Sequence, residues 1–109
     1  MWVTIDADTF DATYLHFMAP IKNAILEKSS FLRILYSHPC FTMNGLFLEL
    51  NPKTDVSKIE KDIMAAHRTT KTKTYAIVRF EPQPRLILKI SGIWENDTSC
   101  GLAYKFLRV

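Results

Sequence analysis

The sequence predicts an α+β fold, a two-layer sandwich in which two helices cover one face of an antiparallel sheet. Three observations support this prediction: three apolar-alternating segments in the last third of the chain, a capped amphipathic helix before them, and shorter strands towards the N-terminus. The predicted order is strand(s), helix, two strands, helix, three strands. This is a ferredoxin-like order extended by a C-terminal three-strand meander, and we expect residues 1–109 to form a single compact domain.

The N-terminal third begins with a short predicted strand at residues 2–5, followed by a turn or a helix entry at 6–11. Residues 12–30 allow two interpretations. Apolar residues at helical spacing (Tyr14, Phe17, Met18, Ile21, Ile25) fit one long amphipathic helix, but Pro20 inside it costs about 3 kcal/mol. We favour, by a small margin, a strand at 13–18 followed by a short helix from Pro20 to Lys28, because proline is well tolerated at the first position of a helix.

The middle of the chain predicts two strands, at 31–37 and 42–50, separated by His38-Pro39-Cys40. Asn44-Gly45 within the second strand indicates a tight turn or a bulge. A helix is expected over 56–67, capped by Thr54 or Asp55, because its apolar residues fall on one face and its charged residues on the other. Residues 69–73 form a polar connection to the meander.

The meander strands are predicted at 75–80, 86–94 and 102–109. Alternation places Ala76, Val78, Phe80, Leu86, Leu88 and Ile90 on one face, and Tyr75, Ile77, Arg79, Ile87 and Lys89 on the opposite face. A sheet with helices on one side needs only one apolar face, and this second face is more apolar than a solvent-facing surface requires.

Composition indicates a folded chain, with 48% hydrophobic and 23% charged residues. The net charge of +3 permits a nucleic-acid or acidic partner without requiring one. Cys40 and Cys100 fit no metal motif or disulfide framework, so we expect free thiols in a reduced compartment. The sequence shows no secretory signal and no apolar run near the ~18–20 residues of a membrane span, which predicts an intracellular protein, cytoplasmic or nuclear, that does not bind membranes.

The sequence carries no pattern that indicates a reaction. His16, His38 and His67 lie on three different predicted elements, and none has a second ligand at helical or hairpin spacing. The three glycines are isolated, so no phosphate-binding glycine-rich loop is predicted. We therefore expect a protein that is not an enzyme, with no catalytic residue, no metal site and no cofactor.

The first functional hypothesis is an adaptor, a protein–protein interaction subunit that assembles into a larger intracellular complex as a homo- or hetero-oligomer. The apolar second face of the meander and the edge of the final strand are the predicted contact surfaces, since exposed sheet edges and apolar patches bind partners. The predicted interface residues are Tyr75, Ile77, Ile87, Tyr104, Phe106 and Leu107.

The alternative hypothesis is a module that binds RNA or another single-stranded nucleic acid through the basic 67–73 segment and the outer face of the sheet. Cations beside an aromatic ring on an open sheet suit this task, because rings stack on bases and cations hold phosphates. The candidate residues are Arg68, Lys71, Lys73, Arg79 and Lys89. A solvated basic loop explains the same cations without any ligand.

The order strand–helix–strand–strand–helix–strand is similar to that of the RNA recognition motif. Residues 45–50, Gly-Leu-Phe-Leu-Glu-Leu, and the helix at 56–67 stand where that family has its third strand and second helix. The family has a basic residue before this glycine and two outward aromatic residues on the strand, whereas this chain has Asn44 and only Phe47. The resemblance is thus one of element order, which many ferredoxin-like domains with unrelated functions share.

Overall fold

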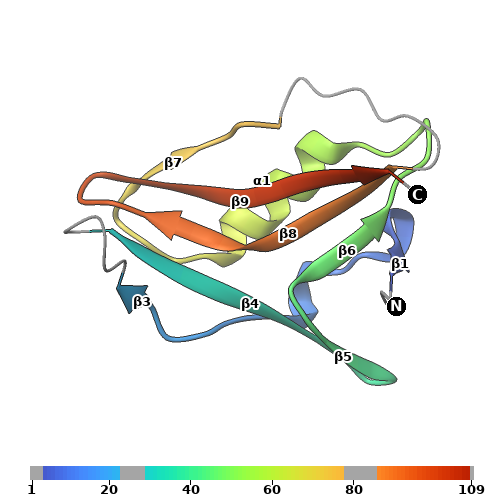
Figure 1. Ribbon diagram of the computed structural model, residues 1–109, viewed down its shortest axis with the longest axis horizontal. Coiled ribbons are helices and arrows are strands. Elements are labelled where there is room, and N and C mark those ends of the chain that lie inside the picture. The colour runs from blue at the N-terminus through green and yellow to red at the C-terminus, as the bar shows by residue number, and fades with distance from the viewer. Residues whose placement is uncertain (1–3, 23–28, 78–85, 109) are drawn as a thin grey trace.

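The computed structural model describes residues 4–22, 29–77 and 86–108, and within them one α-helix packs on a sheet of nine strands (Figure 1). The strands are β1 (Ile5–Asp6), β2 (Leu15–Phe17), β3 (Ile21–Lys22), β4 (Ser30–His38), β5 (Phe41–Asn44), β6 (Leu46–Glu49), β7 (Thr72–Thr74), β8 (Leu86–Glu95) and β9 (Ser99–Arg108). The helix α1 is Val56–Ala66, and the 3₁₀ turns η1 and η2 are Ala7–Thr9 and Ala12–Tyr14. The fold is therefore α+β, with one α-helix in the described residues where the sequence predicted two.

Strand β8 lies at the centre of the sheet. It pairs with β9 along one edge, while on its other edge its first half pairs with β6 and its second half with β4, all antiparallel. The sheet is nevertheless mixed and not purely antiparallel as predicted, because β1 pairs with β6 and β7 with β9 in parallel. The β7–β9 pairing follows from the helix: α1 carries the chain back across the sheet after β6, so the next strand runs in the same direction as β6.

The sheet divides where β4 and β8 separate. These strands pair only over Ser30–Arg33 and Gly92–Glu95; beyond that point β5 follows β4, and β6 follows β8. Gly45 lies at the vertex between β5 and β6, with a φ of 82° that glycine adopts without steric cost, and its N–H donates to the Ile34 carbonyl at 2.8 Å. We call this region the fork. The predicted break at Asn44-Gly45 is thereby confirmed.

The helix predicted from Pro20 to Lys28 does not begin at Pro20. Ile21 and Lys22 instead form β3, which pairs with Phe31 and Ser30 of β4. The ladder with β4 overrides the local helical spacing, as tertiary context often does. Strand β2 confirms the predicted strand in this region, whereas residues 23–28 of the predicted helix and residues 2–3 of the first predicted strand lie outside the described residues.

The first strand of the predicted meander is not confirmed, although β8 and β9 are. Residues 75–77 are not in a strand; the buried Glu60 side chain of α1 accepts hydrogen bonds from the backbone N–H groups of Ala76 at 2.9 Å and Ile77 at 3.2 Å. These bonds replace those that a neighbouring strand would supply. The preceding strand is β7, which lies partly within the predicted polar connection, and residues 78–80 are outside the description.

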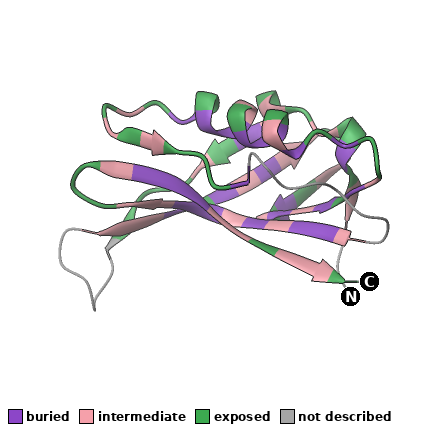
Figure 2. Ribbon diagram, turned by 90° about the horizontal axis from the view of Figure 1, so that it is seen from above, coloured by how far each residue is buried: buried purple, intermediate pink, exposed green. Residues whose placement is uncertain are grey.

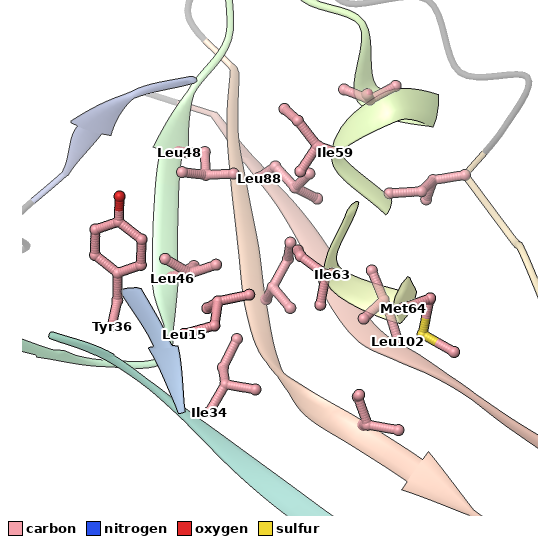
Figure 3. Close-up of a cluster of buried hydrophobic side chains, with 14 of the residues drawn as sticks. Leu15, Ile34, Tyr36, Leu46, Leu48, Ile59, Ile63, Met64, Leu88 and Leu102 are labelled. Carbon is pink, nitrogen blue, oxygen red and sulfur yellow. The ribbon is translucent and has the colours of Figure 1, made fainter. Parts of the chain in front are cut away.

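The hydrophobic core lies between α1 and one face of the sheet (Figures 2 and 3). As predicted, Asp55 caps the helix, its carboxylate accepting from the Lys58 N–H at 3.0 Å. Side chains on one face of the helix then pack with inward side chains of the strands; the labelled members in Figure 3 include Ile59, Ile63, Met64, Leu48, Leu88 and Leu102. No described helix covers the opposite face of the sheet.

Candidate functional site

The face of the sheet turned away from α1 carries a second set of apolar side chains. Register shows which residues share it: Phe31 is paired with Trp94, Ile87 with Leu107, and Phe47 with Lys89. We define the open face by outward residues on β4, β6, β8 and β9, namely Phe31, Arg33, Leu35, Phe47, Glu49, Ile87, Lys89, Trp94, Ala103, Lys105 and Leu107. Of these, only Phe47 also packs against the edge of the described hydrophobic core. The rest form a surface of their own.

Two aromatic rings of the open face lie against glycines of neighbouring strands. A Cβ added at Gly101 would be 2.7 Å from Cζ2 of Trp94, and one added at Gly92 would be 2.9 Å from Cζ of Phe31. Only glycine leaves room for rings this close to the backbone. The two glycines therefore seat two half-buried rings on the surface of the sheet.

At the fork the open face is hollowed. A depression of about 560 Å³ lies where β4 and β8 part, and its lining includes Phe31, Arg33, Asn44, Phe47, Lys89 and Ser91. This volume falls within the roughly 300–1,000 Å³ typical of small-molecule sites. The Lys89 ammonium lies 5.6 Å from the Phe47 ring centroid, in cation–π range, and no Asp or Glu is among the lining residues. The fork hollow is thus aromatic and positively charged.

The basic segment after α1 is tied to β8 by an ionic cluster. Glu95 bonds His67 Nε2 at 2.6 Å with one oxygen and Lys71 Nζ at 3.1 Å with the other. Burial acts to raise the pKa of the Glu95 carboxyl, but hydrogen bonds from His67 and Lys71, with the charge of Lys71, outweigh it and hold this pKa below its ordinary value. Lys71 is thereby engaged in holding the fold together.

The six residues predicted as a partner interface do not lie together. Ile87 and Leu107 are neighbours on the open face, although Ile87 is only 4% exposed. Ile77, predicted on that face, is 2% exposed and belongs to the core because Glu60 draws its segment against α1. Tyr75, beside it, is 39% exposed.

The remaining two predicted interface residues are on β9. Tyr104 and Phe106 are on the core side of the sheet, half-buried, and their rings meet edge to face with centroids 5.7 Å apart. The final strand carries β7 on its outer edge over Ser99–Gly101, so this part is not a free edge. The structure therefore concentrates the predicted interface on Ile87 and Leu107.

The five cations predicted to hold nucleic acid are also dispersed. Lys89 is on the open face, Lys71 is paired with Glu95, and Arg68 is exposed just after α1. Lys73 is half-buried on β7, in register with Cys100 on the core side of β9. Arg79 lies outside the described residues.

Sequence reasoning missed Phe31, Arg33, Asn44 and Trp94. Phe31 and Arg33 alternate outward in a strand that was predicted, so their sharing a face could be inferred from the sequence. Their position beside Lys89 could not be inferred, because it depends on the pairing of β4 with β8, two strands that are far apart in the chain.

The chain matches no known family model, no curated protein and no solved structure. Across residues 4–22, 29–77 and 86–108, no three His, Cys, Asp or Glu side chains gather into a group that could hold a metal ion. No helix in the same residues has the length and apolar character to cross a membrane. Fold and site together define a small α+β domain whose sheet has one covered and one open face.

Proposed function

We propose that this protein is a non-enzymatic interaction subunit that assembles into a larger intracellular complex by packing the open face of its sheet against a protein partner. The observation that carries the proposal is the second apolar surface, where Phe31, Leu35, Trp94 and Leu107 lie on the face without a described helix. Apolar patches on a protein surface are typical of interaction sites, and these four side chains keep part of their surface exposed. Aromatic side chains, Trp above all, dominate the binding energy of such sites.

The charges of the open face indicate the chemistry of the partner's surface. Three cations, Arg33, Lys89 and Lys105, stand among the apolar side chains of the open face and outnumber the one acid on its described strands, Glu49, which is paired with Ile87. Complementary charges steer encounter and fix orientation. The partner surface is therefore apolar with acidic side chains around it.

The test is co-purification of partners with the tagged protein, with and without nuclease, followed by reconstitution with the purified partner. Trp94→Ala and Leu107→Asp remove apolar contacts of the open face and should abolish binding while the circular dichroism spectrum is retained. The unfolding midpoint of Trp94→Ala should fall, because its ring packs against Gly101. Ile87→Asp is unsuitable because Ile87 is almost fully buried, and the variant would test folding.

Tyr75→Asp is the matched control, since Tyr75 is an exposed aromatic residue whose neighbours Ala76 and Ile77 are bound to α1. It should leave binding unchanged. Undiminished binding by both open-face variants, or equal loss in the Tyr75 variant, would contradict the proposal.

A second candidate function, binding of single-stranded nucleic acid, is favoured by one observation: three rings (Phe31, Phe47, Trp94) share the open face with its three cations. Rings and cations on one face suit bases and phosphates. Partners that nuclease releases, and binding that weakens steeply with salt, would favour this function over the first.

A further inference from the structure

The fork hollow is built from four strands, β4, β5, β6 and β8. Phe31 and Arg33 come from β4, Lys89 and Ser91 from β8, and Asn44 and Phe47 flank the vertex at Gly45. The hollow exists because the ladder between β4 and β8 ends at Arg33 and Gly92, while the register of β8 shifts between Ile90 and Gly92. It is therefore a fixed feature of the sheet.

The two cations of the hollow have unused binding capacity. Neither Arg33 nor Lys89 forms an ion pair with any residue in the described part of the chain. Both cations line the hollow, and no Asp or Glu is among its lining residues. Arginine can hold a phosphate through two parallel hydrogen bonds, and lysine adds a point charge.

Aromatic and amide groups complete the lining. The Phe31 ring lines the hollow from β4, and the Phe47 ring, with the Lys89 ammonium 5.6 Å from its centroid, lines it from β6. Stacking on aromatic side chains is a general way to hold an unpaired base. Asn44 and Ser91 supply hydrogen-bond donors and acceptors of the kind that recognise base edges or sugar hydroxyls.

We propose that the fork hollow binds a nucleotide, with the base against Phe31 and the phosphate between Arg33 and Lys89. Ring, cations and amide are the three groups that a base linked to a phosphate requires, and the lining of the fork hollow contains all three. The ligand is either a free mononucleotide or one unit of a single strand. This inference does not depend on the protein partner proposed above.

The test is titration of the purified protein with AMP, adenosine, ribose 5-phosphate and oligoadenylate, followed by isothermal calorimetry and by amide chemical shifts of Asn44, Lys89 and Ser91. AMP should bind more tightly than adenosine or ribose 5-phosphate, because only AMP engages both ring and cations. Arg33→Ala and Lys89→Ala should each weaken AMP binding by roughly tenfold. Phe31→Leu should weaken AMP and adenosine but leave ribose 5-phosphate unchanged.

Lys105→Ala is the matched control, because Lys105 is the exposed register partner of Lys89 on β9 and does not line the hollow. It should bind AMP like the unchanged protein. If oligoadenylate binds far more tightly than AMP, the ligand is one unit of a single-stranded nucleic acid. If the two affinities are equal, the ligand is the free mononucleotide. Both outcomes support the site.

Absence of shifts at these amides with millimolar AMP and with oligoadenylate overturns the inference. Loss of binding in the Lys105 variant equal to that in the Lys89 variant overturns it too, since attraction would then be general to the face. Urea unfolding of each variant separates loss of binding from loss of folding.

Discussion

Glu60 shows how one residue can replace a strand. Its side chain has 0% exposure, and its oxygens accept from the backbone N–H groups of Ala76 and Ile77. Alternating apolar residues at 75–80 predict a strand, yet the described part of that segment bonds to a side chain of α1. A buried acid is stable here because it is hydrogen-bonded.

We predict that Glu60→Ala destabilises the protein by about 1–3 kcal/mol, because two N–H groups near the core lose their acceptor. Glu60→Gln should cost less, since one carbonyl oxygen remains. Urea unfolding measures both, with Lys61→Ala, at the next and exposed position of the same helix, as the control. A Glu60→Ala variant as stable as the Lys61 variant would contradict this role.

Gly92 and Gly101, which lie against the Phe31 and Trp94 rings, allow a second prediction at the scale of residues. A Cβ at position 92 would lie 2.1 Å from the backbone carbonyl oxygen of Leu32, whereas a Cβ at 101 meets only the Trp94 side chain, at 2.7 Å. A backbone carbonyl in a β-ladder cannot move aside as a side chain can. Gly92→Ala should therefore destabilise the protein by about 1–3 kcal/mol, and Gly101→Ala should destabilise it by less.

Denaturant unfolding compares the two alanine variants. Trp94 fluorescence should change in the native state of Gly101→Ala, because its indole is displaced from the sheet. Equal stability of the two variants would show that the strands separate easily at Gly92.

At the scale of elements, the sequence predicts those whose signals are local. The cap at Asp55 and the helical spacing after it define α1, and alternation defines β8 and β9. Both interpretations of residues 12–30 predict Ile21 in a helix, but in the structure it is paired with Phe31 in β4. Pairing between distant strands depends on the whole chain. Alternation within β8 therefore predicts that Lys89 faces outward, but it does not predict that Arg33 of β4 lines the same hollow.

The end of α1 and the end of β8 are joined by Glu95, which makes stability depend on pH. The pKa of Glu95 is lowered in the folded protein from an ordinary value of 4.5, so its contribution is present above that value and is lost as pH falls through the folded pKa. We predict that Glu95→Gln is less stable than the unchanged protein near neutral pH, and that this difference shrinks on acidification.

Urea unfolding at several values between about pH 3 and pH 7 checks this dependence. Glu49→Gln, which changes an exposed carboxylate on β6, serves as the control and should leave the pH profile nearly unchanged. A difference for Glu95→Gln that stays constant down to the lowest pH would show that the cluster does not stabilise the fold through the Glu95 charge.

At the scale of the molecule, the sheet has two unlike faces. One is filled by α1 and excludes water, and the other carries rings, cations and aliphatic side chains without a described helix over them. The same strand, β8, contributes to both: Leu88 faces the core and Ile87 and Lys89 face outward. The core and the proposed binding surface thus lie on opposite sides of one strand.

We predict that Leu88→Ala destabilises by about 2–5 kcal/mol, since Leu88 is fully buried, whereas Leu107→Ala costs roughly 1 kcal/mol or less. Unfolding midpoints and slopes in urea measure both. A Leu107 variant that loses as much stability as the Leu88 variant would mean that the open face is part of the core of the isolated chain.

The central position of β8 has a consequence for how the protein is made. β4, β5 and β6 leave the ribosome before the strand that joins β4 to β6, and β8 in turn needs β9 along its whole other edge. Domains generally fold as units during synthesis, so these early strands wait with apolar surface exposed until residues 86–108 emerge. A nascent chain stalled before β8 should therefore stay open to proteases and chaperones, and only translation through β9 closes the sheet.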